Sequence, residues 1–209
     1  MKKEDLLLYL VTDRGLSLGR DMEWIVEEAV AGGVTMVQLR EKDCSTKEFI
    51  ELARRLKAAL DPSGVPLIIN DRVDVALAVD ADGVHIGQSD MPYTIARALL
   101  GKDKIIGLSV ENMAEVEEAD ALDVDYIGVS PVFSTATKTD TAAPFGLDGL
   151  RKAAAMSVHP VVAIGGMNAR TAASVMQAGA DGIAVVSAIV SAESPRRASE
   201  ELLDIITGK

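Results

Sequence analysis

The 209-residue sequence predicts an α/β protein that folds as a single (β/α)8 barrel, also called a TIM barrel. Short apolar runs alternate with amphipathic segments along the whole chain. The apolar runs are nearly continuous, as expected for parallel strands that are buried on both faces. Eight such strands in strict alternation with eight helical segments favour a closed parallel barrel over other α/β arrangements.

The expected strands each end in polar or small residues, and a weak internal repeat supports their number. They span residues 7–13, 35–40, 66–70, 83–87, 105–110, 126–130, 160–166 and 182–188. A small or acidic turn followed by a strand recurs in AGGVTMVQ (31–38), DADGVHIG (80–87), DVDYIGVS (123–130) and GADGIAVV (179–186). An open doubly wound sheet is the alternative, but polar residues follow many strands here rather than two that flank one crevice.

The segments between the strands carry helix signals. Apolar residues recur at helical spacing in residues 22–30. Ser45 and Glu48 have the spacing of a capping box, which marks a helix start. No linker or low-complexity stretch divides the sequence, so we expect one catalytic domain over residues 1–209.

The composition excludes several classes of partner. With 21 Lys and Arg against 32 Asp and Glu, the net charge is −11, which disfavours binding to nucleic acid or anionic membranes. The single cysteine, Cys44, cannot form an intrachain disulfide. The apolar run at residues 6–11 is shorter than a signal-peptide core, and no run approaches the roughly 18 residues of a membrane span. We therefore expect a cytoplasmic protein.

Cationic side chains follow the second expected strand. Active sites of such barrels lie at the C-terminal ends of the strands. Gln38 and Arg40 alternate with Leu39, so they should point into the barrel, and Lys42 follows in the loop. A guanidinium fork and an ammonium group suit a pyrophosphate. The alternative for this segment is a solvated basic loop.

Acidic side chains follow the third and fourth strands. Asn70 and Asp71 end one strand and Asp90 follows the next, so both carboxylates should meet at one barrel end. Together they could hold one Mg²⁺, with water and substrate oxygens completing its shell. Asn70 and Asp71 could instead only cap the next helix. His85 lies within an apolar strand and is interpreted as a core histidine, and no His/Cys cluster suggests zinc.

Ser109 and a long loop provide further polar groups. Ser109 lies near the end of the fifth strand, and residues 131–146 form the longest stretch without periodicity. In that loop the hydroxyl groups of Thr135 and Thr137 stand beside Lys138, a combination that suits phosphate oxygens. The loop could close as a lid, or it could be a plain flexible connection.

The last two strands indicate a monophosphate site. Gly165 and Gly166 follow the seventh strand, and we expect Asn168 to open the next helix. The segment VVSAI (185–189) follows the eighth strand and contains Ser187. Backbone N–H groups in these two loops commonly bind phosphate in such barrels. No nucleophile with a nearby base is evident, which favours a reaction driven by leaving-group stabilisation.

The motifs resemble the thiamine phosphate synthase family along nearly the whole chain. They are LYLVTDR, VQLREKD, IINDRVDVAL, DGVHIGQSDMP, IGLSV, GVSPVFSTATK, VVAIGGM and GADGIAVVSAI, in this order. The resemblance implies a transferase that couples a pyrimidine pyrophosphate to a thiazole phosphate, with one Mg²⁺ and dissociative loss of pyrophosphate. It also implies an enzyme that forms homo-oligomers. A related thiazole tautomerase and a non-catalytic phosphate-binding barrel are the alternatives.

The resemblance assigns roles residue by residue. Residues implied to bind the pyrimidine pyrophosphate are Gln38, Arg40, Lys42, Asn70, Ser109 and Lys138. Those implied to contact the thiazole phosphate are Thr135, Thr137, Gly166, Val186 and Ser187. Asp71 and Asp90 are the implied Mg²⁺ ligands, and Lys138, Arg40 and Ser109 the implied catalytic groups.

Overall fold

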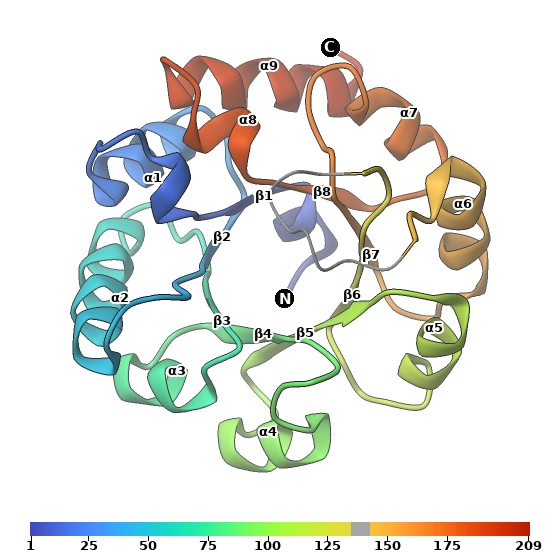
Figure 1. The fold of residues 1–209 in the computed structure, drawn as a ribbon, viewed down its shortest axis with the longest axis horizontal. Helices are drawn as coiled ribbons and strands as arrows, with labels where there is room; N and C mark the ends of the chain where they lie inside the picture. Colours follow the sequence, from blue (N-terminus) through green and yellow to red (C-terminus); the bar gives the residue numbers. More distant parts are fainter. Residues whose placement is uncertain (135–142) are drawn as a thin grey trace.

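Each strand of the sheet pairs in parallel with its neighbours in chain order, and the last strand returns to the first (Figure 1). The computed structural model describes residues 1–134 and 143–209. Its strands are β1 (Leu8–Val11), β2 (Met36–Leu39), β3 (Leu67–Asn70), β4 (Gly83–Ile86), β5 (Ile105–Val110), β6 (Tyr126–Val129), β7 (Val161–Ile164) and β8 (Gly182–Val185). The closed barrel confirms the predicted fold, and the open sheet is excluded.

Helices surround the barrel on its outer side (Figure 1). They are α1 (Met22–Ala31), α2 (Thr46–Leu60), α3 (Val73–Val79), α4 (Tyr93–Leu100), α5 (Met113–Ala119), α6 (Gly146–Met156), α7 (Ala172–Gln177), α8 (Ser187–Val190) and α9 (Pro195–Thr207). Short 3₁₀ helices, η1 (Lys3–Leu6) and η2 (Arg14–Leu16), flank β1. Within the two described ranges, none of the helices has the length and apolar character needed to cross a membrane.

Alternation along the strands divides the buried residues into two cores. Leu8 and Leu10 of β1 belong to the large cluster between strands and helices. Tyr9 and Val11 belong to a smaller cluster that also contains Tyr126 of β6 and fills the barrel. Successive side chains of a strand point to opposite faces, so the barrel interior is packed rather than hollow.

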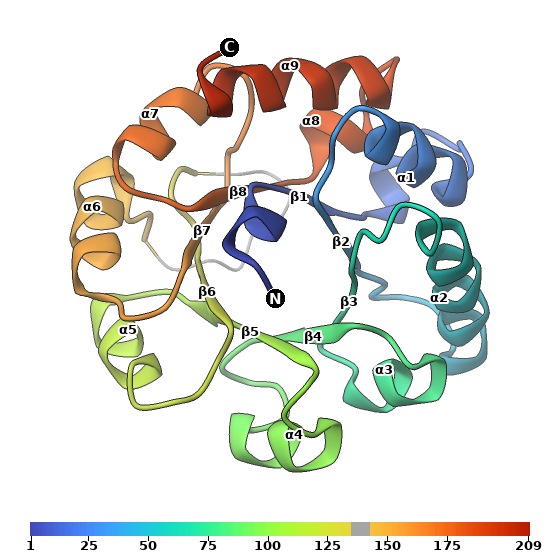
Figure 2. The ribbon, with the colours of Figure 1, turned by 180° about the vertical axis from the view of Figure 1, so that it is seen from behind.

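The N-terminal segment closes one end of the barrel. Figure 2 shows η1 lying across that opening, on the side away from the view of Figure 1. Leu6 is fully buried and packs in the inner cluster. A Cβ atom at Gly182 would overlap the carbonyl group of Leu6, so only glycine permits this close approach. The opposite end, where the strands terminate, is therefore the open one.

Two glycines make room for large polar side chains inside the barrel. A Cβ atom at Gly107 of β5 would overlap the ring of Tyr126. At Gly128 of β6 it would lie 2.9 Å from Cδ1 of Ile164 and 3.1 Å from Cε1 of His85. Real Cβ atoms essentially never make a contact of 2.9 Å, and at 3.1 Å the neighbouring ring would have to shift. The missing side chains on β5 and β6 thus leave the volume that Tyr126 and His85 occupy.

Candidate functional site

A cavity of about 540 Å³ opens at the C-terminal ends of the strands. It gathers residues from every strand or the loop that follows it. Every predicted site residue that the structure describes lines it, namely Gln38, Arg40, Lys42, Asn70, Asp71, Asp90, Ser109, Gly166, Val186 and Ser187. The other three predictions, Thr135, Thr137 and Lys138, lie outside the described residues. The barrel therefore brings ten predicted residues, which lie far apart in the sequence, to one cavity.

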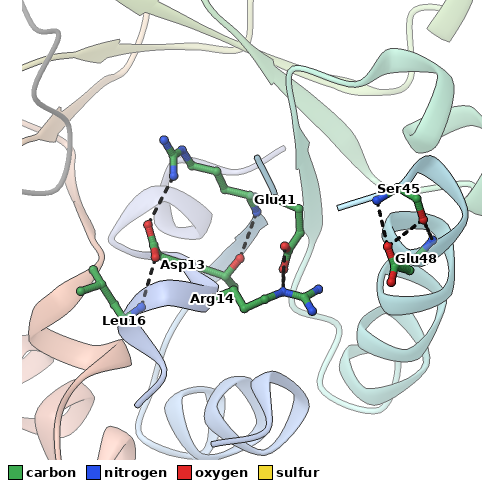
Figure 3. Close-up of polar contacts among 8 residues, drawn as sticks. Asp13, Arg14, Leu16, Glu41, Ser45 and Glu48 are labelled. Atoms are coloured by element: carbon green, nitrogen blue, oxygen red, sulfur yellow. Dashed lines mark hydrogen bonds and ion pairs between the residues drawn. The ribbon is translucent and has the colours of Figure 1, made fainter. Parts of the chain in front are cut away.

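Arg40 is held at the cavity wall by residues after β1. Its backbone N–H donates to the hydroxyl group of Thr12 at 3.0 Å. Its guanidinium group forms an ion pair with Asp13 at 3.4 Å, and Asp13 also accepts a bond from the backbone of Leu16 (Figure 3). A side chain anchored at both ends loses less entropy when it binds an anion. The predicted inward direction of Arg40 is confirmed.

The loop that carries Lys42 is fixed at both of its ends. Glu41, whose side chain is almost fully buried, pairs with Arg14 at 3.0 Å. Ser45 and Glu48 form the predicted capping box at the start of α2. Figure 3 shows these contacts on either side of the loop. The basic segment after β2 therefore lines the cavity with Arg40 and Lys42, while about half of the Lys42 side chain stays exposed to solvent.

Asp71 and Asp90 lie beside each other at the cavity. Lys42 Nζ donates to Asp71 Oδ2 at 2.9 Å, and the N–H of Gly87 donates to Asp90 Oδ2 at 2.8 Å. Burial raises the pKa of Asp90, and so does the neighbouring Asp71 carboxylate, while the Gly87 N–H and Lys42 oppose the shift. Asp71 and Asp90 therefore form an acidic pair at the cavity, and Lys42 neutralises part of its charge.

The helix-capping alternative for Asn70 and Asp71 is wrong. The residue that precedes α3 is Arg72, and its side chain makes no capping bond. Asp71 has a φ of +62°, a left-handed conformation that is uncommon outside glycine. Its N–H donates to the carbonyl group of His85 on β4 at 2.8 Å. This strained turn directs the Asp71 side chain toward Lys42 and Asp90 instead of α3.

A chain of buried hydrogen bonds forms the floor of the cavity. Gln38 Nε2 donates to the Tyr9 hydroxyl at 2.8 Å, and the hydroxyls of Tyr9 and Tyr126 are 2.9 Å apart. His85 Nδ1 lies 2.9 Å from the Tyr126 hydroxyl, and His85 Nε2 lies 2.8 Å from Ser109 Oγ. Burial raises the pKa of both tyrosines, so both hydroxyls stay protonated.

This network corrects the interpretation of His85. The residue is buried, as predicted, but it also lines the cavity and touches Ser109. A polar residue at an inward position of β4 was the available sequence signal, since His85 alternates with Val84 and Ile86 of the outer core. Glu111, Gln88 and Thr12 also line the cavity and were not predicted. The Gln88 amide donates to the Ser109 carbonyl at 2.8 Å.

Loops after β7 and β8 form the other side of the cavity. Gly165 and Gly166 have φ values of +95° and +72°, and a Cβ at Gly166 would lie 2.9 Å from Cβ of Phe133. Asn168 does not open the next helix, because α7 begins four residues later at Ala172. Its side-chain oxygen accepts the N–H of Arg170 at 3.0 Å in the turn before α7, and its amide nitrogen donates to the Gly166 carbonyl at 2.9 Å. Asn168 thus shapes the glycine turn.

In residues 1–134 and 143–209, no three His, Cys, Asp or Glu side chains gather as a metal-binding group. The Asp71–Asp90 pair is therefore a two-carboxylate site. Such a pair is unlike a structural zinc site, which needs four protein ligands. It suits Mg²⁺, which keeps several waters and uses one or two carboxylates together with substrate phosphates.

Known proteins share this fold and sequence. A sequence model described as thiamine monophosphate synthase matches residues 8–189. A thiamine-phosphate synthase of Chloroflexus aurantiacus is 53% identical over 97% of this chain and 94% of its own, and one of Vibrio campbellii is 54% identical over 95% and 97%. A solved structure of thiamine phosphate pyrophosphorylase from Pyrococcus furiosus has 42% identity and a TM-score of 0.91, covering 99% of this chain and 98% of that one.

Proposed function

The chain belongs to the thiamine monophosphate synthase family, and we propose that its cavity is where the family's condensation takes place. The enzyme is a transferase that joins 4-amino-2-methyl-5-hydroxymethylpyrimidine pyrophosphate to hydroxyethylthiazole phosphate, giving thiamine phosphate and pyrophosphate. One observation carries the assignment of the site. Strands β2 to β4 lie across the barrel ring from β7 and β8 (Figure 1). The cavity therefore has cationic and acidic side chains on one side and glycines on the other.

Arg40 and Lys42 are proposed to bind the pyrophosphate of the first substrate. Arg40 offers a planar fork of N–H donors. Lys42 offers a positive charge, which forms an ion pair with Asp71 in the structure. The protein is acidic overall, so attraction for a polyanion must come from local cations such as these. Lys138 has the same proposed role, assigned through the family motif.

Asp71 and Asp90 are proposed to hold Mg²⁺ beside that pyrophosphate. The fit rests on the donor set: two adjacent carboxylates, one with a raised pKa, carry more negative charge than Lys42 alone neutralises. When bound, the ion would supply charge neutralisation on the pyrophosphate oxygens. Removal of either carboxylate should weaken binding of the ion more than it weakens binding of the second substrate.

The proposed chemistry needs no protein nucleophile. The bond between the pyrimidine methylene carbon and the pyrophosphate oxygen breaks, and its electron pair leaves with the pyrophosphate. The aminopyrimidine ring delocalises the resulting positive charge. The lone pair of the thiazole nitrogen then forms the new carbon–nitrogen bond. Arg40 and Lys42 stabilise the leaving group, while Gln38, Asn70 and Ser109 on the cavity floor orient the ring.

The thiazole phosphate is proposed to bind between the loops after β7 and β8. Gly166, Val186 and Ser187 line that part of the cavity. The positive φ of Gly166 and the absence of a side chain allow backbone N–H groups to approach a phosphate closely. Placing the phosphate there would hold the thiazole nitrogen over the pyrimidine, across the barrel from the acid pair. Thr135 and Thr137 complete the proposed site.

The alternative activities do not account for the charged residues on one side of the cavity. A thiazole tautomerase or a sensor of a monophosphate has no use for a pyrophosphate site. Support for the synthase comes from Asp71, which pairs with Lys42 and neighbours Asp90 at the cavity. Because one lysine neutralises only one of the two adjacent carboxylates, the pair keeps negative charge for a metal ion, and this favours the synthase.

The deciding experiment is a turnover assay with both substrates. Purified protein should release pyrophosphate and form thiamine phosphate when Mg²⁺ is present, and EDTA should stop the reaction. Either substrate alone should give no release, which controls for a plain pyrophosphatase. Folded protein that consumes neither substrate with Mg²⁺ would refute the assignment, and full activity in EDTA would refute the metal site alone.

We also infer that the enzyme works in the cytoplasm as a homo-oligomer. Leu77 on α3 and Ile95 and Leu99 on α4 are about half exposed, which gives an assembly an apolar surface on neighbouring helices. Light scattering coupled to size exclusion measures the mass. A monomer at every concentration would contradict the inference on assembly.

A further inference from the structure

The cavity floor contains a serine and a histidine in contact, an arrangement that in other enzymes marks a nucleophile and its base. His85 Nε2 lies 2.8 Å from Ser109 Oγ. In such pairs the histidine nitrogen accepts the serine proton, and a third group holds the other ring nitrogen as a donor. Here the third group is the hydroxyl of Tyr126. The sense of its hydrogen bond therefore decides what Ser109 can do.

We propose that Gln38, Tyr9, Tyr126 and His85 form a one-directional hydrogen-bond relay that orients the Ser109 hydroxyl proton into the cavity. The proposal rests on the proposed function only in treating Ser109 as a substrate contact. Tyr9, Tyr126 and His85 are then positioning residues, which act on the substrate through Gln38 and Ser109.

The direction follows from proton counting along the relay. Gln38 Nε2 is a donor, so the Tyr9 oxygen accepts its N–H. Each tyrosine hydroxyl carries one proton, because burial keeps both phenols neutral. The Tyr9 proton therefore points to the Tyr126 oxygen, 2.9 Å away. The remaining donor of Tyr126 is its own proton, which must point to His85 Nδ1.

The histidine transmits this direction to the serine. Since Nδ1 accepts a proton from Tyr126, the neutral imidazole carries its hydrogen on Nε2. Nε2 then donates to Ser109 Oγ, and the serine proton is directed away from His85. In this state His85 cannot remove the Ser109 proton. Ser109 is a hydrogen-bond donor to the ligand and not an activated nucleophile.

Packing around the relay keeps it in one geometry. Tyr126 has no exposed surface, stacks on His85 with ring centroids 5.5 Å apart, and meets Tyr9 edge-on at 5.9 Å. Gly107 and Gly128 leave only the space that these rings fill. A fully satisfied buried network of this kind rigidifies its members, so Gln38 and Ser109 are fixed at a set spacing across the floor.

The first test reads the histidine directly. The protein has two histidines, so His159→Gln leaves His85 alone in the ¹⁵N spectrum of the folded protein. At about pH 8, where imidazole is neutral, we expect an unprotonated Nδ1 and a protonated Nε2. Gln38→Glu replaces the donor by a carboxylate acceptor, so it should reverse the relay and move the proton to Nδ1. An Nδ1–H tautomer in the parent, or no change in Gln38→Glu, would overturn the relay.

The second test uses kinetics, with the three tyrosines as a matched set. Tyr126→Phe keeps the ring and removes the hydroxyl, and should lower kcat/KM for the pyrimidine pyrophosphate about tenfold. The KM for the thiazole phosphate should stay within about twofold of the parent value. Tyr9→Phe is the second variant in case Tyr126→Phe folds poorly, and we expect the same effect from it. Tyr93→Phe, whose hydroxyl bonds the carbonyl of Asp123 on the outer surface, should change neither constant.

Equal losses for both substrates in Tyr126→Phe would mean a general structural effect and would overturn the positioning role. The spectroscopic test needs no substrate, so it can fail or succeed independently of the proposed function. An inactive parent protein with the expected tautomer would refute the function and keep the relay. An active parent protein with the opposite tautomer would keep the function and refute the relay.

Discussion

Gly107→Ala tests how tightly the barrel interior is built. The added methyl group would overlap the outer end of the Tyr126 ring. The end of a side chain can usually move at little cost. Here the ring has no exposed surface and is hydrogen-bonded to Tyr9 and His85, so it has no free space to enter. We therefore expect strain in the core and loss of at least one of these hydrogen bonds.

Overpacking of a core typically costs about 1 to 3 kcal/mol, and a lost buried hydrogen bond adds roughly 1 kcal/mol. The sum of about 2 to 4 kcal/mol corresponds to a fall in Tm of roughly 4 to 16 °C for a protein of this size. Turnover should fall too, because Tyr126 supports His85 at the cavity floor.

Scanning calorimetry and the turnover assay measure these two effects. Gly64→Ala is the control, since nothing lies within 4 Å of its added methyl group and only its φ of +67° opposes the change. An unchanged Tm and unchanged kcat in Gly107→Ala would refute the claim that this glycine exists to accommodate Tyr126.

Three further substitutions test the site. Asp90→Asn should abolish Mg²⁺-dependent turnover and leave thiazole phosphate binding, measured by calorimetry, largely intact; equal loss of both would contradict two separate substrate sites. The raised pKa of Asp90 means that its protonated form favours folding and that this contribution disappears as pH rises through the folded pKa. Metal-free Asp90→Asn should therefore have a higher Tm than the parent at neutral pH, and the difference should shrink as both are acidified; a lower Tm at neutral pH would contradict it. Arg40→Lys keeps the charge but loses the fork held by Asp13, so KM for the pyrimidine substrate should rise about tenfold, whereas an unchanged KM would remove the bidentate role. Lys138→Ala should slow turnover with little change in Tm, and a large fall in Tm would argue for a structural role.

Strand periodicity and strand order were enough to predict much of the site. Gln38 and Arg40 were placed inside the barrel because they alternate with Leu39, and the structure confirms both the packing of Leu39 outside and the place of Gln38 and Arg40 at the cavity. Asp71 and Asp90 were brought together by the rule that parallel strands end at one edge. These inferences need only the alternation of side chains along each strand and the order of the strands.

Other features depend on contacts that periodicity does not contain. The two ring nitrogens of His85 meet Ser109 and Tyr126, which are 24 and 41 residues away in the chain. The pairing of β4 with β5 and of β5 with β6 brings these residues together. The start of α7 was misplaced because the Asn168 oxygen caps a turn at Arg170 that precedes the helix, while its amide nitrogen fixes the Gly166 carbonyl.

The closure of one barrel end by η1 has a consequence for how ligands reach the cavity floor. Among the residues that the structure describes, Leu6 and the inner cluster close the end of the barrel opposite the cavity, so we expect substrates and products to pass through the cavity mouth. We therefore expect a ligand on the Gln38–Ser109 floor to exchange slowly while another ligand occupies the cavity mouth.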